Sequence, residues 1–105
     1  MNLEMKIQSA TRQEVNMTSF HGQTIRFTYN DLVSVFGEPD SGDGYKTNCN
    51  WSLKINNVPF TIYDWKEPFN PQDFPDAYLE WHISSREPLS LENLIAIRRY
   101  IDSKI

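Results

Sequence analysis

Cysteine is almost absent from this chain of 105 residues, and its scarcity excludes several kinds of site. The single thiol of Cys49 cannot form an internal disulfide, and one thiolate cannot supply the ligand sets of common structural zinc sites. A disulfide-stapled secreted fold is therefore excluded, and a reducing cytoplasm is the expected compartment. No metal or other cofactor is expected.

Long hydrophobic runs and an excess of basic residues are also missing. No apolar stretch reaches the roughly 18 residues of a membrane span, and residues 1–18 lack the apolar core of a signal peptide. Asp and Glu total 14 against 10 Lys and Arg, which gives a net charge of -4. Since phosphate binding needs a basic surface, neither a nucleic acid nor a membrane is an expected partner.

Aromatic residues are plentiful, at 13% of the chain. Each aromatic side chain can bury about 150–250 Å², which helps so short a chain to build a core. The length fits one domain over residues 1–105, in which residues 1–16 form a loose arm or an edge element.

Apolar and polar residues alternate in several segments, as in half-buried strands. Asn56-Asn57 separates two of these segments, and Asn tolerates the left-handed conformation that a tight hairpin turn requires. Residues 66–76 hold three prolines and are expected to form a structured loop. The segments predicted as strands are 17–28 (a short strand or a hairpin), 49–55, 58–65 and 77–84.

Two helices are predicted from capping signals and apolar spacing. Thr28 or Asn30 can cap a short helix that ends at Gly37, and Ser90 can cap a longer C-terminal helix. The C-terminal helix carries its apolar face at i, i+3, i+7 and i+11 from Leu94. The expected fold is α+β: an antiparallel sheet of about four strands, a short helix after the first strand or strands, and the C-terminal helix packed on one face.

Catalytic motifs are incomplete. Asp64, Glu80 and His82 match a metal-nuclease arrangement only loosely, because a histidine stands where a lysine is expected. Cys49 alternates in step with apolar neighbours, which favours a small buried residue over a nucleophile. The acidic and glycine-rich stretch 40–44 lacks the spacing of a calcium loop and is interpreted as a flexible turn. No catalytic residue and no metal ligand is therefore expected.

Four short strings in the sequence together resemble a known group of proteins. The strings FGEP (36–39), DGYKT (43–47), IYDWK (62–66) and WHI (81–83) occur in this order. Together they resemble a group of short proteins encoded by phages and mobile elements, over roughly positions 24–84. The resemblance implies a phage or prophage origin, a host cytoplasm as location, and action by binding a host component, without implying any catalytic residue.

Aromatic and charged residues near the ends of the central strands form the expected binding patch. We expect a non-enzymatic protein that binds a host macromolecule, such as a component of host defence, through aromatic anchors with an acidic rim. A nucleotide-sequestering protein is the first alternative and a metal-dependent nuclease the second. Sheet edges leave pairing with a second copy of the chain open. The binding residues predicted are Tyr45, Lys46, Tyr63, Asp64, Trp65, Lys66, Asp40 and Asp43.

Overall fold

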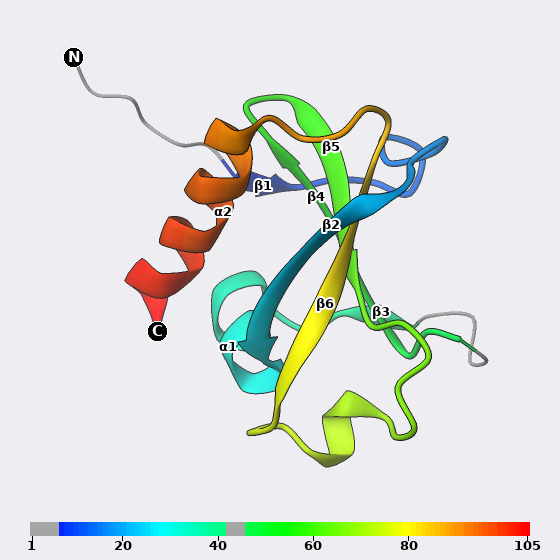
Figure 1. Cartoon of the computed structure of the whole chain (residues 1–105), viewed down its shortest axis with the longest axis vertical. Coiled ribbons are helices and arrows are strands. Elements are labelled where there is room, and N and C mark those ends of the chain that lie inside the picture. Colours follow the sequence, from blue (N-terminus) through cyan, green and yellow to red (C-terminus); the bar gives the residue numbers. More distant parts are fainter. Residues whose placement is uncertain (1–6, 42–45) are drawn as a thin grey trace.

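The computed structural model describes residues 7–41 and 46–105. Within these ranges it shows an antiparallel sheet with two α-helices, so the predicted α+β class is confirmed (Figure 1). The C-terminal helix is present as predicted. In chain order the elements are β1 (Ile7–Ser9), β2 (Ser19–Thr28), α1 (Tyr29–Phe36), β3 (Asp40–Ser41), β4 (Cys49–Ile55), β5 (Val58–Tyr63), the 3₁₀ turn η1 (Pro71–Asp73), β6 (Tyr78–Ser85) and α2 (Leu91–Lys104).

The described part of the sheet has six strands in the order β1-β4-β5-β6-β2, with β3 also paired to β4. β1 pairs with one end of β4 through Ile7 and Ile55, and β3 pairs with the other end through Ser41 and Cys49. β5 occupies the opposite edge of β4, so the two short strands share one edge. The predicted number of about four strands was too low. β1 and β3 have only three and two residues, and each is a strand only through its pairing with β4.

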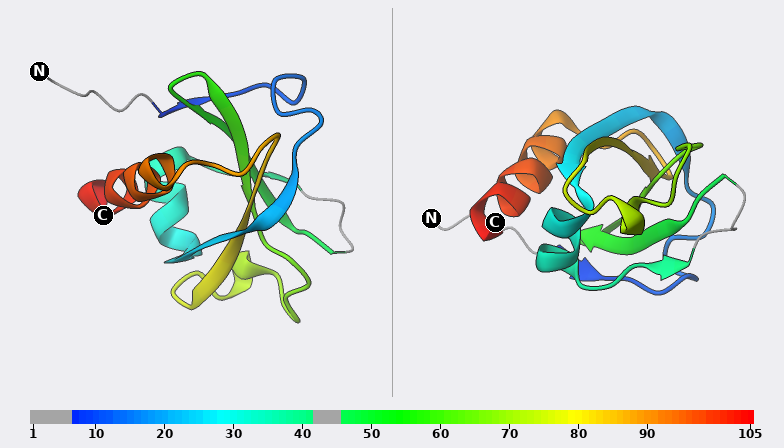
Figure 2. Two further views of the ribbon diagram at one scale, coloured as in Figure 1. Left: turned by 45° about the horizontal axis from the view of Figure 1, so that its top comes forward. Right: turned by 90° about the horizontal axis from the view of Figure 1, so that it is seen from below.

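The two faces of the sheet differ, as the alternation predicted. The inner face packs against α1 and α2, which lie on the same side of the strongly twisted sheet (Figure 2). The outer face is covered by neither helix. The main inner-face residues are Ile25, Phe27, Trp51, Leu53, Ile55, Phe60, Ile62, Leu79, Trp81 and Ile83, and they form one core with Leu32, Ile97 and Ile101 of the helices.

Both helices begin at their predicted caps. The Thr28 hydroxyl accepts a hydrogen bond from the Asp31 amide while the Asp31 carboxylate accepts one from the Thr28 amide, which forms a capping box. The Ser90 hydroxyl accepts from the amide of Asn93 at the start of α2. Gly37 ends α1 with φ 83°, a conformation that glycine adopts without steric penalty.

A tight turn joins β4 to β5, and an irregularity interrupts the pairing of β2. Asn56 and Asn57 have φ of 50° and 70°, as in the two-residue hairpin turn that was predicted. The 17–28 segment does not form a hairpin: most of it is the single strand β2, whose pairing with β6 is irregular between Phe20 and Thr24. Of the helices in the described ranges, none combines the length and apolarity that crossing a membrane requires.

Candidate functional site

The outer face carries a transverse row of hydroxyl groups at its centre. Ser52 of β4 lies opposite Thr61 of β5, and Thr61 lies opposite Ser84 of β6. The Thr61 and Ser84 hydroxyls are in hydrogen-bond contact, and Ser84 also donates to the hydroxyl of Thr18 at 3.0 Å. The register of three strands therefore aligns donors and acceptors across the sheet.

An aromatic cluster lies one step along the strands from the hydroxyl row. Tyr63 of β5 lies opposite His82 of β6, with ring centroids 5.6 Å apart. The His82 imidazole is stacked on Phe20 at 4.1 Å and lies nearly parallel to the Trp65 indole at 6.0 Å. Phe20 is 43% exposed and Trp65 is 38% exposed. Four rings from three segments of the chain thus form one partly exposed aromatic cluster, defined here as Phe20, Tyr63, Trp65 and His82.

Two lysines lie beside this aromatic cluster. The ammonium groups of Lys46 and Lys66 are each 5.5 Å from the centre of the Trp65 ring, within the range of a cation–π contact. The Lys66 amide donates to the Lys46 carbonyl at 2.7 Å, which holds the two segments together. Lys46, Tyr63, Trp65 and Lys66, all predicted as binding residues, are therefore neighbours in the structure.

Asp64, predicted as part of an acidic rim, is buried instead. Its side chain is 1% exposed, and the oxygen Oδ1 accepts hydrogen bonds from the amides of Asn48 and Cys49, both at 2.8 Å. Oδ2 accepts from the Asn48 side chain at 3.2 Å. The prediction for Asp64 was wrong because the strand pleat directs this side chain inward, where it ties the end of β5 to the start of β4.

The remaining predicted residues lie apart from the aromatic cluster or outside the described ranges. Asp40 is exposed on β3 and lines a separate hollow of about 230 Å³ that also includes Glu38 and Phe36. Asp43 and Tyr45 lie outside the residues that the structure describes. The acidic rim predicted from Asp40, Asp43 and Asp64 therefore has one described, exposed member.

A hollow of about 350 Å³ opens between the aromatic cluster and the turn formed by residues 11–17. Arg12 is the only charged side chain among its described lining residues, and no carboxylate is among them. The rest of the lining combines rings with hydroxyl and amide groups. The described lining consists of Arg12, Val15, Thr18, Ser19, Phe20, Thr47, Asn50, Ser52, Thr61, Tyr63, Trp65 and Ser84.

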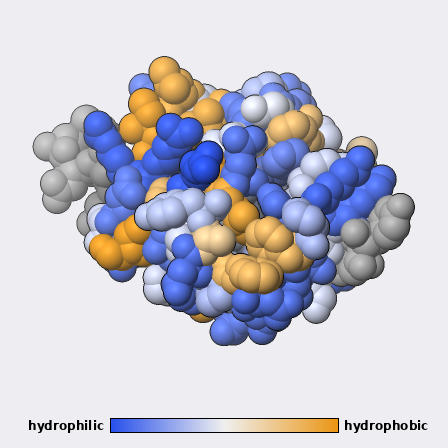
Figure 3. All heavy atoms as spheres, turned by 60° about the horizontal axis from the view of Figure 1, so that its bottom comes forward, coloured by the Kyte–Doolittle hydropathy of each residue, from blue (hydrophilic) through white to orange (hydrophobic). Residues whose placement is uncertain are grey.

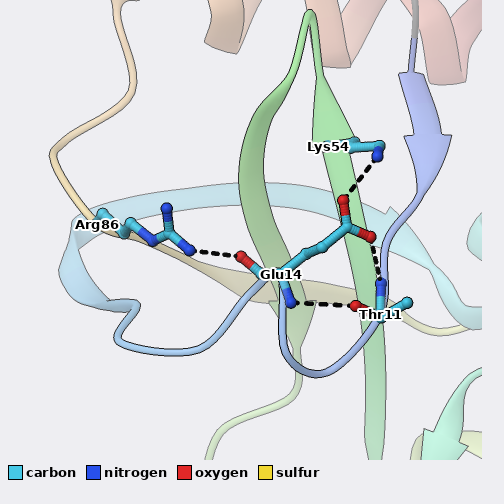
Figure 4. A network of polar contacts seen from close by, with 4 residues as sticks. All are labelled: Thr11, Glu14, Lys54 and Arg86. Carbon is cyan, nitrogen blue, oxygen red and sulfur yellow. Dashed lines mark hydrogen bonds and ion pairs between the residues drawn. The ribbon is translucent and has the colours of Figure 1, made fainter.

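The turn that carries Arg12 is fixed by polar contacts (Figure 4). Glu14 forms an ion pair of 2.7 Å with Lys54 of β4, and its second carboxylate oxygen accepts from the Thr11 amide. Arg86, just after β6, donates to the Glu14 carbonyl at 2.8 Å. The Lys54 contact is the largest of the influences that lower the pKa of Glu14. The turn is therefore tied to β4 and to the segment that follows β6, beside the hollow.

Arg12 and Phe20 were missed by sequence reasoning. Arg12 lies in a segment without periodicity, and its place beside the hollow depends on the contacts of Glu14 with distant residues. Phe20 lies where the irregular pairing of β2 breaks the alternation. The sequence did contain a local signal of this bulge, because a glycine inside a strand often marks a bulge and Gly22 lies between Phe20 and Thr24. Gly22 has a φ of 84° in the structure.

Neither the metal-nuclease arrangement nor a reactive Cys49 nucleophile is formed by the described residues. Among the described residues no group of three His, Cys, Asp or Glu side chains could hold a metal ion, and Asp64 is occupied by amide donors. Burial raises the pKa of Cys49 to about 12, with Asp64 and Glu38 adding to the rise. A thiol with that pKa stays protonated near neutral pH, whereas nucleophilic attack requires the thiolate.

Other exposed apolar residues lie on elements away from the aromatic cluster. Leu91, Ile95 and Ile105 are exposed on or beside α2, and Phe74 follows η1. Figure 3 shows hydrophobic groups on the underside of the molecule that are separated by hydrophilic residues. The aromatic cluster of the outer face is set apart from them by its ring-to-ring packing and by the adjoining hollow.

Comparison of the chain with protein-family models, with curated proteins and with solved structures finds no match.

Proposed function

We propose that this chain is a non-enzymatic binding protein, and that a partner protein docks on the outer face of its sheet. The observation that carries the proposal is the aromatic cluster on the half of the sheet that neither helix covers. Exposed aromatic patches mark interaction sites more often than isolated exposed residues do. Trp, Tyr and Arg dominate the energetic hot spots of interfaces, and Trp65, Tyr63 and Arg12 all line the hollow.

The charges around the docking surface favour an acidic partner. Arg12 lines the hollow, and the ammonium groups of Lys46 and Lys66 lie over Trp65. Opposite charges across an interface speed association and select the correct orientation. Arg12, Lys46 and Lys66 thus place three cations beside the proposed site, although Glu80 lies close enough to His82 to influence its pKa and the chain as a whole is acidic.

The class of partner is inferred from the resemblance of the sequence to phage-encoded proteins. A host protein is the proposed partner, and inhibition of a host defence component is the proposed consequence.

Affinity capture with three baits tests the docking surface. The wild-type chain, Trp65→Ala and Phe74→Ala would be immobilised in equal amounts, and proteins retained from the lysate of a candidate host would be quantified by mass spectrometry. Phe74 is the matched control, because it is an exposed aromatic residue that does not line the hollow. Circular dichroism would verify that each bait is folded.

The proposal predicts one protein retained in stoichiometric amount by the wild-type and Phe74→Ala baits and lost from the Trp65→Ala bait. Equal retention by all three folded baits would exclude the outer face as the docking surface. Retention of no protein from that host would contradict the choice of partner.

A further inference from the structure

The hollow on the outer face has the size and lining of a site for a small ligand. Its volume of about 350 Å³ lies at the lower end of the roughly 300–1,000 Å³ that is common for such sites. Rings of Phe20, Tyr63 and Trp65 contribute flat apolar surface. Aromatic rings of this kind stack on nucleobases, since every base presents a π-face.

The hydroxyl row supplies the polar part of the lining. Ser52, Thr61 and Ser84 lie side by side on neighbouring strands. Ser84 donates its proton to Thr18 and Thr61 donates to Ser84, so these two hydroxyls offer acceptor lone pairs, whereas Ser52 keeps its own proton for a ligand. Asn50, opposite Tyr63, adds an amide that can both donate and accept a hydrogen bond. A ligand with several hydroxyl groups, such as a pentose, matches this surface better than an apolar ligand does.

Arg12 gives the hollow its charge preference. The structure contains no hydrogen bond or ion pair between the Arg12 guanidinium and any other residue in 7–41 and 46–105. Its acidic neighbour Glu14 is occupied by Lys54 and by the Thr11 amide. An arginine without a carboxylate partner, placed at a hollow without described acidic groups, favours an anion, and guanidinium geometry suits phosphate.

We propose that this hollow binds a free nucleoside monophosphate, with the sugar over the hydroxyl row and the phosphate at Arg12. The Tyr63 and Trp65 rings stand 83° apart, so the base would stack on one ring and meet the edge of the other. One guanidinium in the described lining matches one phosphate group. A polymer would need an extended basic surface, and the net charge of -4 opposes it. The nucleotide would occupy residues that the docking protein also uses, so the two ligands exclude each other, and a nucleotide titration on the isolated chain tests this site without any partner protein.

Isothermal titration calorimetry on the purified chain tests this site. The probes are AMP, GMP, CMP and UMP, with adenosine, inorganic phosphate and a ten-nucleotide oligothymidylate as comparisons. The variants are Arg12→Gln, Trp65→Ala and the control Arg99→Gln, which changes an exposed arginine of α2 that does not line the hollow.

The proposal predicts that at least one monophosphate binds, and that Arg12→Gln weakens it by about tenfold or more, as expected for a lost charge-assisted hydrogen bond. Adenosine affinity should be the same in Arg12→Gln and wild type, Trp65→Ala should weaken nucleotide and nucleoside alike, and Arg99→Gln should bind as wild type does.

Four outcomes would overturn the proposal: no heat of binding with any monophosphate at millimolar concentration, equal affinity in Arg12→Gln, inorganic phosphate binding as tightly as the nucleotides, or tighter binding of the oligonucleotide. The third would reveal a simple anion site and the fourth a site for single strands.

Discussion

The ring of Phe20 lies flat on the imidazole of His82, with centroids 4.1 Å apart and planes 11° from parallel. These residues do not face each other in the strand register, because Phe20 lies opposite Ser84 and Thr24 lies opposite His82. The irregular stretch between Phe20 and Thr24 brings the Phe20 ring over the neighbouring pair. A local bulge in β2 thus completes the aromatic cluster, and such bulges commonly redirect side chains beside functional sites.

Stability should fall as His82 becomes protonated. Burial lowers the pKa of His82 below its usual value of 6.5, while Glu80 opposes the shift. The unfolded chain therefore binds this proton more readily than the folded chain does, so stability present above about pH 6.5 is lost as the pH falls towards the folded pKa. Urea unfolding at pH 7.5 and pH 5.5 should show a larger loss for wild type than for His82→Phe, which keeps a stacking ring. Equal losses would contradict the assignment.

Removal of the Asp64 carboxylate should destabilise the fold. In Asp64→Ala the amides of Asn48 and Cys49 lose their shared acceptor, and an unsatisfied buried donor costs about 1–3 kcal/mol. We expect the free energy of unfolding to drop by about 2–4 kcal/mol for the two amides together. Asp64→Asn retains one carbonyl oxygen for both amides and should lose less. Urea titrations that give the two variants equal stability would show that the shared acceptor is not the cause.

Gly37 should not tolerate a side chain, for reasons of backbone conformation alone. Its φ of 83° and ψ of -170° lie in a region occupied almost only by glycine. A Cβ atom there would meet nothing within 4 Å, so Gly37→Ala should lose about 1–3 kcal/mol through strain rather than collision. Ser34→Ala, an exposed change on the same helix, should stay within about 0.5 kcal/mol of wild type. Equal urea midpoints for both variants would contradict this explanation.

Much of the fold follows from local signals in the sequence. The capping box at Thr28, the Asn56-Asn57 turn and the alternation in β4 are each decided by residues close in the chain. β3 could not be predicted in this way, and β1 only as the edge-element alternative for residues 1–16, because strands of two or three residues exist only through pairing with β4. Their sequences contain no period that would distinguish them from a loop.

Only those parts of the candidate site that come from residues close together in the sequence were predicted. Tyr63 and Trp65 are two residues apart and were expected on one face, whereas Phe20 reaches them through a bulge in a distant strand. Asp64 was misplaced although a signal existed: it continues the inward alternation of Phe60 and Ile62. The expectation that charged side chains stay in water outweighed that alternation, and three hydrogen bonds explain why the burial is tolerated.

Hydroxyl-radical footprinting of the captured complex tests the central claim most directly. The method reports the solvent exposure of individual side chains, and both faces of the molecule offer exposed reporters: Phe20 and Trp65 on the outer face, Leu91 and Ile95 on α2. Docking on the outer face predicts that oxidation of Phe20 and Trp65 falls in the complex while oxidation of Leu91 and Ile95 is unchanged. Protection of the α2 residues with no change at Phe20 and Trp65 would contradict the account.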